Sequence, residues 1–195
     1  MIEFKSKTSE PLPFSEMKRI SEALLKRGDW KKALMLAIPA YLMLRYSDYT
    51  RLKWGDFKKD RIIIIEKKTE KTKRKRTPRT IKVSTEVKRI INEARPEWAD
   101  DKDLIFAKKG EIKPFTIGYV NNEIKRLGIE FNVPIEHFSS HSLIKSGCLE
   151  LYEKNGKSDA ALLLICKIRN HSSPAITMQY LGLTQRIIDA AYESL

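Results

Sequence analysis

The residues with the clearest chemical potential are a histidine and a tyrosine near the C-terminal end of the chain. The segment from residue 167 to 182 reads Lys-Ile-Arg-Asn-His-Ser-Ser-Pro-Ala-Ile-Thr-Met-Gln-Tyr-Leu-Gly, which places His171 nine residues before Tyr180. A tyrosine hydroxyl can attack a phosphodiester and hold the cleaved strand as an ester when cations and hydrogen-bond donors stabilise the charge growing on the phosphorus oxygens. His171 is one candidate donor. Taken alone, Tyr180 fits better as an ordinary exposed tyrosine of a helix, so the assignment depends on other motifs.

A second motif stands where a long apolar segment ends, around Arg45. It reads Met-Leu-Arg-Tyr-Ser-Asp from residue 43 to 48 and continues as Leu-Lys-Trp-Gly-Asp-Phe from residue 52 to 57. The planar guanidinium of an arginine can hold two non-bridging phosphate oxygens at once, which the point charge of a lysine cannot do. The alternative is a salt bridge between Arg45 and Asp48 on one helix face.

Three segments together resemble the catalytic domain of the tyrosine recombinases, which include the phage integrases. The string from His171 to Tyr180 matches the family, including its spacing, and the Arg45 motif is similar to the family's Gly-Leu-Arg-hydrophobic-Ser-Glu/Asp with Met43 in place of glycine. The third segment, Ser-His-Ser-Leu-Ile-Lys-Ser-Gly from residue 140 to 147, is similar to His-x-Leu-Arg-His/Lys-Thr/Ser. The resemblance covers residues 39–180. It implies that Tyr180 is the nucleophile, that Arg45 is the first catalytic arginine, and that His141 accepts the tyrosine proton or donates to the phosphate.

One position departs from this pattern. Ile144 stands where the family has its second phosphate-binding arginine. Isoleucine brings neither charge nor a donor, and the loss of such a contact costs about 10²-fold or more in rate. A neighbouring cation, Lys145 or Arg169, can fill the vacant contact. Otherwise the chain is a recombinase-fold protein that binds a DNA site without cutting it.

A strongly basic hairpin lies between the Arg45 and His141 motifs. The β-branched run Arg61–Glu66 and the alternating run Arg79–Ser84 predict two strands. Residues 66–82 hold nine basic and two acidic residues, a net charge of +7. The resemblance implies a catalytic lysine in this hairpin, Lys68, or in another register Lys67 or Lys71, which protonates the leaving 5′ oxygen. We expect the hairpin to follow a DNA backbone rather than to be only a solvated loop, through Lys67, Lys71, Lys73, Arg74, Lys75, Arg76 and Arg79.

The composition is consistent with this interpretation. The chain has 195 residues, 42% of them hydrophobic, which predicts one compact domain. Its 38 basic and 25 acidic residues give a net charge of +13, which favours a polyanionic partner such as double-stranded DNA. Cys148 and Cys166 lie in apolar runs and are expected to be buried, free thiols. Without a cysteine or histidine cluster, a membrane-length apolar run or a signal peptide, we expect no metal site and no membrane partner. The resemblance implies a reaction with no cofactor and no small-molecule substrate.

The elements that must position these residues are mainly helical. We predict an α+β fold, mostly α-helical with a small three-stranded antiparallel sheet, in which 104–106 forms a short strand or a strand-like connection. Ser15 is expected to cap the first helix, and Pro39 to kink or interrupt the second. Residues 1–13 are expected to be an extended lead-in and 184–195 a C-terminal helix. The whole chain then forms a single catalytic-type domain without the family's N-terminal core-binding domain.

The preferred function is site-specific DNA recombination, by integration, excision, inversion or resolution, through a 3′-phosphotyrosyl intermediate on Tyr180. The alternatives are the non-cleaving DNA-binding protein and, less favoured, a nicking and closing activity of the topoisomerase kind. Self-association on DNA as a dimer or tetramer is expected from the resemblance. The protein is expected in the cytoplasm with the nucleoid, or inside a host cell if it comes from a virus or plasmid.

Overall fold

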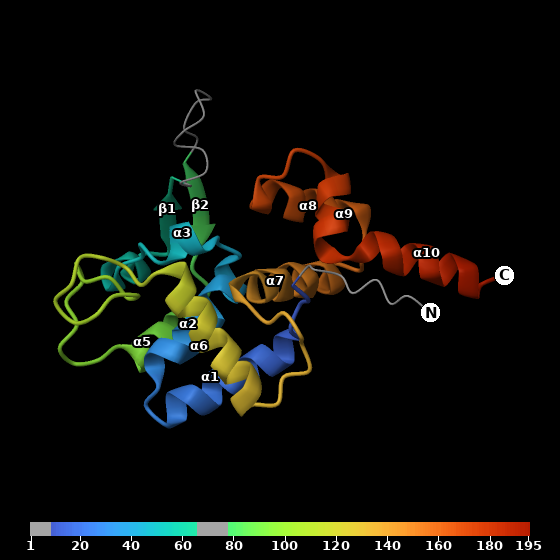
Figure 1. Ribbon diagram of the computed structural model, residues 1–195. Coiled ribbons are helices and arrows are strands. Elements are labelled where there is room, and N and C mark those ends of the chain that lie inside the picture. Colours follow the sequence, from blue (N-terminus) through green and yellow to red (C-terminus); the bar gives the residue numbers. More distant parts are fainter. Residues whose placement is uncertain (1–8, 66–77) are drawn as a thin grey trace.

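The computed structural model describes residues 9–65 and 78–195, with the side chains of residues 186 and 187 set aside (Figure 1). The elements run in the order α1 (Phe14–Lys26), α2 (Trp30–Leu42), α3 (Tyr46–Tyr49), the 3₁₀ helix η1 (Trp54–Lys58), β1 (Arg61–Ile64), β2 (Arg79–Lys82), α5 (Thr85–Ala94), α6 (Ile117–Glu130), α7 (Ser140–Lys154), α8 (Asp159–Arg169), α9 (Pro174–Leu181) and α10 (Leu183–Glu193). The hairpin loop lies outside the described residues, and with it the predicted site residues Lys67, Lys68, Lys71, Lys73, Arg74, Lys75 and Arg76.

Helices α2 and α7 form the centre of the molecule. Nearly every side chain of α2 from Ala33 onward is buried, and the helix continues through Pro39 without the interruption that was one of the two predicted outcomes. The two helices approach most closely at Gly147, where an added Cβ would lie 1.9 Å from the carbonyl oxygen of Ala40. Glycine is required there because any side chain would push the backbones apart. This crossing fixes where the first half of α7 lies relative to the end of α2.

Helices α1, α5 and α6 surround this pair. Each buries the apolar face that the spacing of its hydrophobic residues predicts. Met17, Ile20 and Leu24 of α1 are fully buried. The predicted cap at Ser15 is wrong, because α1 begins one residue before it, at Phe14, and the Pro13 carbonyl accepts the first helical hydrogen bond, from Met17. Proline fits this place because its backbone angle φ is already suited to a helix start.

The sheet has two strands in the described residues, not the three that were predicted. β1 and β2 pair antiparallel with Arg61 opposite Lys82 and Ile64 opposite Arg79. Within the described part of the chain, the segment 104–106 forms only one isolated bridge, with Leu104 opposite Lys53. Ile105 and Phe106 are completely buried. Hydrophobic burial and single backbone bonds to nearby loops therefore hold this segment in place, and a continuous ladder does not form.

The C-terminal helices form a smaller layer that packs on α7. Ile144 and Cys148 from α7 make a second apolar cluster with side chains from α8 and α9 and from the start of α10. Figure 1 shows α8 and α9 beside the hairpin, with α10 projecting away from the rest of the molecule. Cys148 and Cys166 are buried free thiols, as predicted. Within residues 9–65 and 78–195, no helix has both the length and the apolar character needed to cross a bilayer.

Candidate active site

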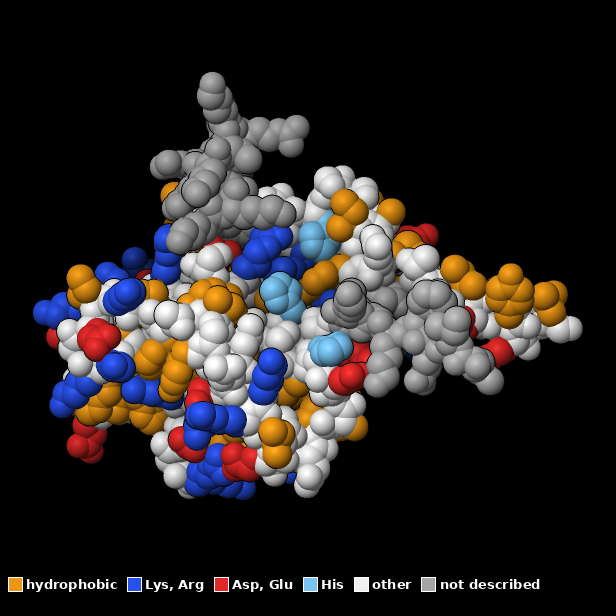
Figure 2. Space-filling model, viewed as in Figure 1, with side chains coloured by type: hydrophobic (Ala, Val, Ile, Leu, Met, Phe, Trp, Pro, Cys, Tyr) orange, Lys and Arg blue, Asp and Glu red, His pale blue; other side chains and the backbone are white. Residues whose placement is uncertain are grey.

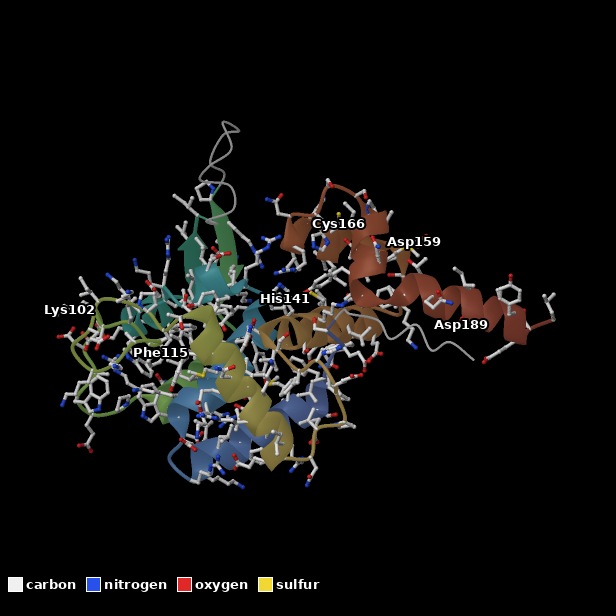
Figure 3. All side chains as sticks on the ribbon, viewed as in Figure 1. Lys102, Phe115, His141, Asp159, Cys166 and Asp189 are labelled. Atoms are coloured by element: carbon white, nitrogen blue, oxygen red, sulfur yellow. The ribbon has the colours of Figure 1, made fainter. Side chains whose placement is uncertain are left out.

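Basic and histidine side chains gather on the face between the β1–β2 hairpin and α8. Figure 2 shows this group of Lys, Arg and His side chains, and Figure 3 labels His141, which lies in the first turn of α7. Three separate segments contribute to it, namely the turn after α2, the first turns of α7, and the end of α8 with the turn that follows it, and helix α9 places Tyr180 beside them. Each segment has a local reason for its conformation.

The turn after α2 presents Arg45. Met43 has the left-handed backbone conformation, with φ 50° and ψ 39°, and so ends α2 and reverses the chain. Glycine adopts this conformation with little cost, which explains why glycine suits this position and why Met43 is unusual there. Leu44 is then buried, and Arg45 stands at the start of α3. The Nη2 group of Arg45 donates to the backbone carbonyl of Arg169, at 3.0 Å and 124 residues away in sequence.

The first turn of α7 presents His141. Ser139 N–H donates to the Ser142 hydroxyl at 3.2 Å, and Ser140 N–H donates to Oδ1 of Asn121 on α6 at 3.1 Å. Both bonds satisfy amides that a helix start leaves without partners. His141 lies at the surface. Partial loss of its hydration, and then the charges of Arg169, Lys145 and Arg45, lower the pKa of the imidazole below its ordinary value of 6.5. The imidazole is therefore neutral at neutral pH and able to accept a proton.

The turn between α8 and α9 presents His171. Asn170 adopts the left-handed conformation that ends α8, and the Ser173 hydroxyl accepts from Ile176 N–H as Pro174 opens α9. Nδ1 of His171 is hydrogen-bonded to the Thr177 hydroxyl at 3.0 Å. The Cys166 thiol donates to the His171 carbonyl at 3.4 Å. The imidazole is thus oriented before any DNA is bound.

Tyr180 lies on α9 among cations. Its ring is 5.4 Å from the His171 ring, with Lys145 Nζ 5.1 Å and the Arg169 guanidinium carbon 5.6 Å from the ring centre. The hydroxyl is buried and, among the described residues, makes no hydrogen bond of ordinary geometry, although the Arg169 side chain is close enough to act on it as a weak donor. Burial raises the pKa of this phenol well above its ordinary value, and the charges of Arg169 and Arg45 partly oppose the rise. The phenol is therefore protonated at neutral pH, and attack requires a proton acceptor and a path to the DNA.

Ile144 does not reach this group of cations. It is fully buried and packs with Cys148, Leu162 and Ile165 in the second apolar cluster. Two cations lie near Tyr180 from other positions, Lys145 on α7 and Arg169 at the end of α8, and both are buried, at 7% and 2% exposed. The charge that position 144 lacks is therefore present close by.

The structure thus brings together Arg45, His141, His171 and Tyr180, and their catalytic roles stay predictions. Arg79, on β2 beside the group, donates from Nη2 to the Leu42 carbonyl at 3.2 Å. Sequence reasoning missed Thr177 and Asn121 as positioning residues. Thr177 had a local signal, because it stands three residues before Tyr180 on the same helix face. Asn121 had none, because its contact with α7 is long-range.

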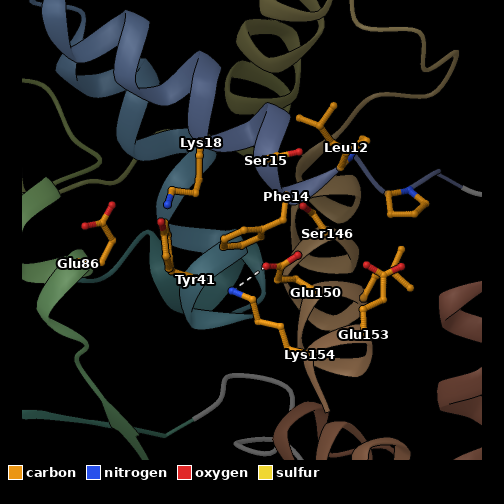
Figure 4. A pocket seen from close by; sticks show the side chains of 13 residues that line it. Leu12, Phe14, Ser15, Lys18, Tyr41, Glu86, Ser146, Glu150, Glu153 and Lys154 are labelled. Atoms are coloured by element: carbon orange, nitrogen blue, oxygen red, sulfur yellow. Dashed lines mark ion pairs between the residues drawn. The ribbon is translucent and has the colours of Figure 1, made fainter. Parts of the chain in front are cut away.

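A surface pocket among the described residues lies away from this group. It has a volume of about 720 Å³ and is lined by α1 and α7 together with Tyr41 and Glu86 (Figure 4). Three glutamates and two lysines line it, among them Glu150, which pairs with Lys154 at 2.8 Å. This lining has no excess of positive charge, so the pocket is not suited to a DNA phosphate.

Comparison with known proteins agrees with the geometry. The model of the phage integrase family matches residues 10–186. The XerA recombinase structure is 20% identical, with a TM-score of 0.67 over 94% of this chain and 64% of that one. The XerH recombinase bound to its difH substrate is 20% identical, with a TM-score of 0.65 over 95% and 55% of the two chains. A Tn1549 transposon integrase in complex with transposon right end DNA is 17% identical, with a TM-score of 0.66 over 97% and 68%.

These structures share the fold of this chain, which spans only 64% of the XerA chain and 55% of the XerH chain. No curated protein matches the sequence. The family model, by contrast, extends over most of the chain and includes every described residue of the group around Tyr180. The chain belongs to the phage integrase family, the tyrosine recombinases.

Proposed function

We propose that this protein catalyses site-specific DNA recombination by cleaving and rejoining strands through a 3′-phosphotyrosyl intermediate on Tyr180. The observation that carries the proposal is the set of charges around one phenol. The His171 ring, Lys145 and Arg169 lie close to the Tyr180 ring, the charge of Arg45 also acts on its hydroxyl, and the same three cations act on His141. Such a concentration of donors and positive charge is what a pentacoordinate phosphorane with charged equatorial oxygens requires.

Each group has a role that fits its chemistry. The Tyr180 oxygen forms a bond to phosphorus while the bond from phosphorus to the 5′ oxygen breaks. The tyrosine proton passes to His141, whose lowered pKa keeps it in the accepting form. Arg45 holds a non-bridging oxygen, and His171 donates to the same phosphate. The leaving 5′ oxygen takes its proton from Lys68, or from Lys67 or Lys71, and rejoining reverses these steps.

The chemistry needs a change in the position of α9. The Tyr180 hydroxyl is enclosed in the conformation described here, so a phosphate reaches it only after the tyrosine turns outward. Relatives bound to DNA, XerH on difH and a lambda integrase dimer on a core site, share the fold. We extend the proposal to binding of double-stranded DNA and to self-association on it. Helix α10, which projects from the molecule with Ile188 and Tyr192 exposed, is a candidate contact between copies.

A second candidate is a recombinase-fold protein that binds DNA without cutting it. Ile144 favours it, because the family's arginine position is both apolar and completely buried. In that case Tyr180 is only a packing residue of α9. The two candidates make opposite predictions for a covalent adduct.

The test is covalent trapping on a suicide substrate. The substrate is a labelled pool of duplexes with randomised sequence around a nick, so that cleavage releases a short fragment that diffuses away and prevents rejoining. We expect a labelled protein–DNA band that survives denaturant, with the DNA attached at Tyr180 by mass spectrometry. Tyr180→Phe should remove the band, whereas the control Tyr192→Phe, at an exposed tyrosine of α10, should keep it. Sequence-dependent binding without any adduct would support the second candidate, and an adduct that survives Tyr180→Phe would reject Tyr180 as the nucleophile.

A further inference from the structure

Arg169 is a buried cation whose donors are only partly used. Its side chain is 2% exposed, and within the described residues its Nε has no hydrogen-bond partner and no carboxylate forms an ion pair with it. Taking a charge out of water costs free energy that an opposite charge must offset. A buried guanidinium without a carboxylate therefore marks a place suited to an anion that is not part of the chain.

The surroundings of Arg169 hold it in a fixed position. It is the last residue of α8, immediately before the left-handed Asn170. Its Nη1 donates to the carbonyl of Met43, at the end of α2. Its backbone carbonyl accepts from Arg45 Nη2 at 3.0 Å. The two arginines thus form one unit that ties α8 to the turn after α2, and the Arg169 guanidinium carbon lies 5.6 Å from the centre of the Tyr180 ring.

This position complements the one that Ile144 leaves apolar. Ile144 and Cys148 lie one turn apart on the face of α7 that meets α8 and α9. The Arg169 guanidinium carbon lies 5.6 Å from the centre of the Tyr180 ring, and Tyr180 packs against the same apolar cluster as Ile144 and Cys148. Arg169 therefore brings a positive charge from α8 to the edge of the cluster in which Ile144 lies.

From this geometry we infer that Arg169 binds a non-bridging oxygen of the DNA phosphate that Tyr180 attacks, and so acts as a catalytic residue together with Arg45. The inference rests on the proposed function and deepens it, because it explains how a recombinase can work with isoleucine at position 144. The Nε–H group and the Nη groups of one guanidinium offer a planar pair of donors suited to two phosphate oxygens. Lys145, also over the Tyr180 ring, is the competing candidate.

The test measures the rate of adduct formation on the suicide substrate for four single variants, of which Lys145→Met probes the competing candidate. Arg169→Gln keeps hydrogen-bonding capacity but removes the charge, and we expect a loss of about 10²-fold or more in rate. Arg169→Lys keeps the charge without the planar fork and should fall between Arg169→Gln and the unaltered protein. Lys167→Gln is the matched control, because Lys167 is an exposed cation on the same helix, and it should leave the rate unchanged.

A second readout separates a contact to the phosphate from a structural role. In a methylphosphonate substrate, a neutral methyl group replaces one charged non-bridging oxygen of the scissile phosphate. An arginine that neutralises this oxygen has less to stabilise there, so the gap between the rates of Arg169→Gln and the unaltered protein should narrow by about tenfold or more. If the variant only distorted the fold, the gap would be the same on both substrates.

The outcomes are distinguishable. Three results would each overturn the assignment and leave the proposed function standing. The first is adduct formation at an unchanged rate in Arg169→Gln, and the second is a difference in rate that does not narrow on the methylphosphonate. The third is a large loss of rate in Lys145→Met with little loss of rate in Arg169→Gln. Absence of any adduct from the unaltered protein would overturn the proposed function and this inference with it. If Arg169→Gln fails to fold, Arg169→Lys supplies the same comparison on the two substrates.

Discussion

The close crossing of α2 and α7 makes Gly147→Ala the most informative single change. The new Cβ would lie 1.9 Å from the Ala40 carbonyl oxygen and 2.9 Å from its carbon. An ordinary carbon–oxygen contact is about 3.3 Å, so the helices would have to separate by roughly 1.4 Å. The clash is with backbone, which cannot rotate away as a side chain can.

Two opposing effects set the size of the change. Alanine is favoured over glycine inside a helix by about 1 kcal/mol. Overpacking costs about 1–3 kcal/mol, and a clash with backbone belongs at the upper end of that range. We therefore expect Gly147→Ala to lower the free energy of unfolding by about 2 kcal/mol. For a chain of this length that corresponds to a fall in melting temperature of about 4–8 °C.

The assay is urea denaturation followed by circular dichroism, combined with covalent trapping. The control is Gly118→Ala on α6, where the nearest atom to a new Cβ is the Thr116 hydroxyl oxygen at 4.0 Å. This control should be as stable as the unaltered protein or slightly more stable. Because α7 carries His141 and Lys145 while Arg45 follows the end of α2, separation of the helices should also slow adduct formation. If Gly147→Ala proved as stable and as active as Gly118→Ala, the argument that this crossing positions the site would fail.

Four further predictions concern the site itself. Ile144→Arg should lower the free energy of unfolding by at least about 3 kcal/mol, because it buries a second positive charge in an apolar cluster beside Arg169. It should also form the adduct no faster than the unaltered protein. The control Ile144→Val should lower the free energy of unfolding by about 1 kcal/mol in denaturant titrations. Tyr180→Phe should abolish the adduct yet raise the free energy of unfolding by about 1 kcal/mol, since it removes a buried hydroxyl without a hydrogen bond of ordinary geometry in the described residues, and a less stable variant would contradict this. Since the pKa of His141 is lowered, the rate of adduct formation should be constant around neutral pH and should decline in acid with a midpoint below pH 6.5. In a pH–rate profile of His141→Gln, this decline in acid should be absent. Changing all four basic residues from 73 to 76 to Ala should weaken DNA binding for every sequence and flatten the salt dependence of affinity, and an unchanged salt slope in a filter-binding titration would mean that these residues are only solvated.

Much of the local structure follows from the sequence alone. The Ser-Pro pair at 173 and 174 starts a helix by capping and by a preset φ, and that helix carries Tyr180 back toward His171. The β-branched run after Arg61 forms one strand of a hairpin, with Ile62 and Ile64 facing the core. These features depend on neighbours a few residues apart, so the pattern of side chains is sufficient to predict them.

The sequence also predicted which residues form the candidate site, through three motifs that resemble the family, and their roles stay predictions. It did not show how the site is completed. The sheet was predicted to have three strands, and 104–106 was expected to be a short strand or a strand-like connection. Ile105 and Phe106 are held by burial against several elements and not by a continuous strand partner. Apolar composition alone does not distinguish a buried strand of a sheet from a buried segment without a continuous strand partner.

Only the tertiary structure decided where the charges lie. Arg45 and Arg169 are 124 residues apart, and their contact depends on the crossing at Gly147 and on the left-handed turns at Met43 and Asn170. The sequence shows an isoleucine in place of an arginine at position 144 and several cations nearby. The fold buries that isoleucine and brings the Arg169 guanidinium to Tyr180, because long-range helix packing, which no local pattern encodes, sets the direction in which each side chain points.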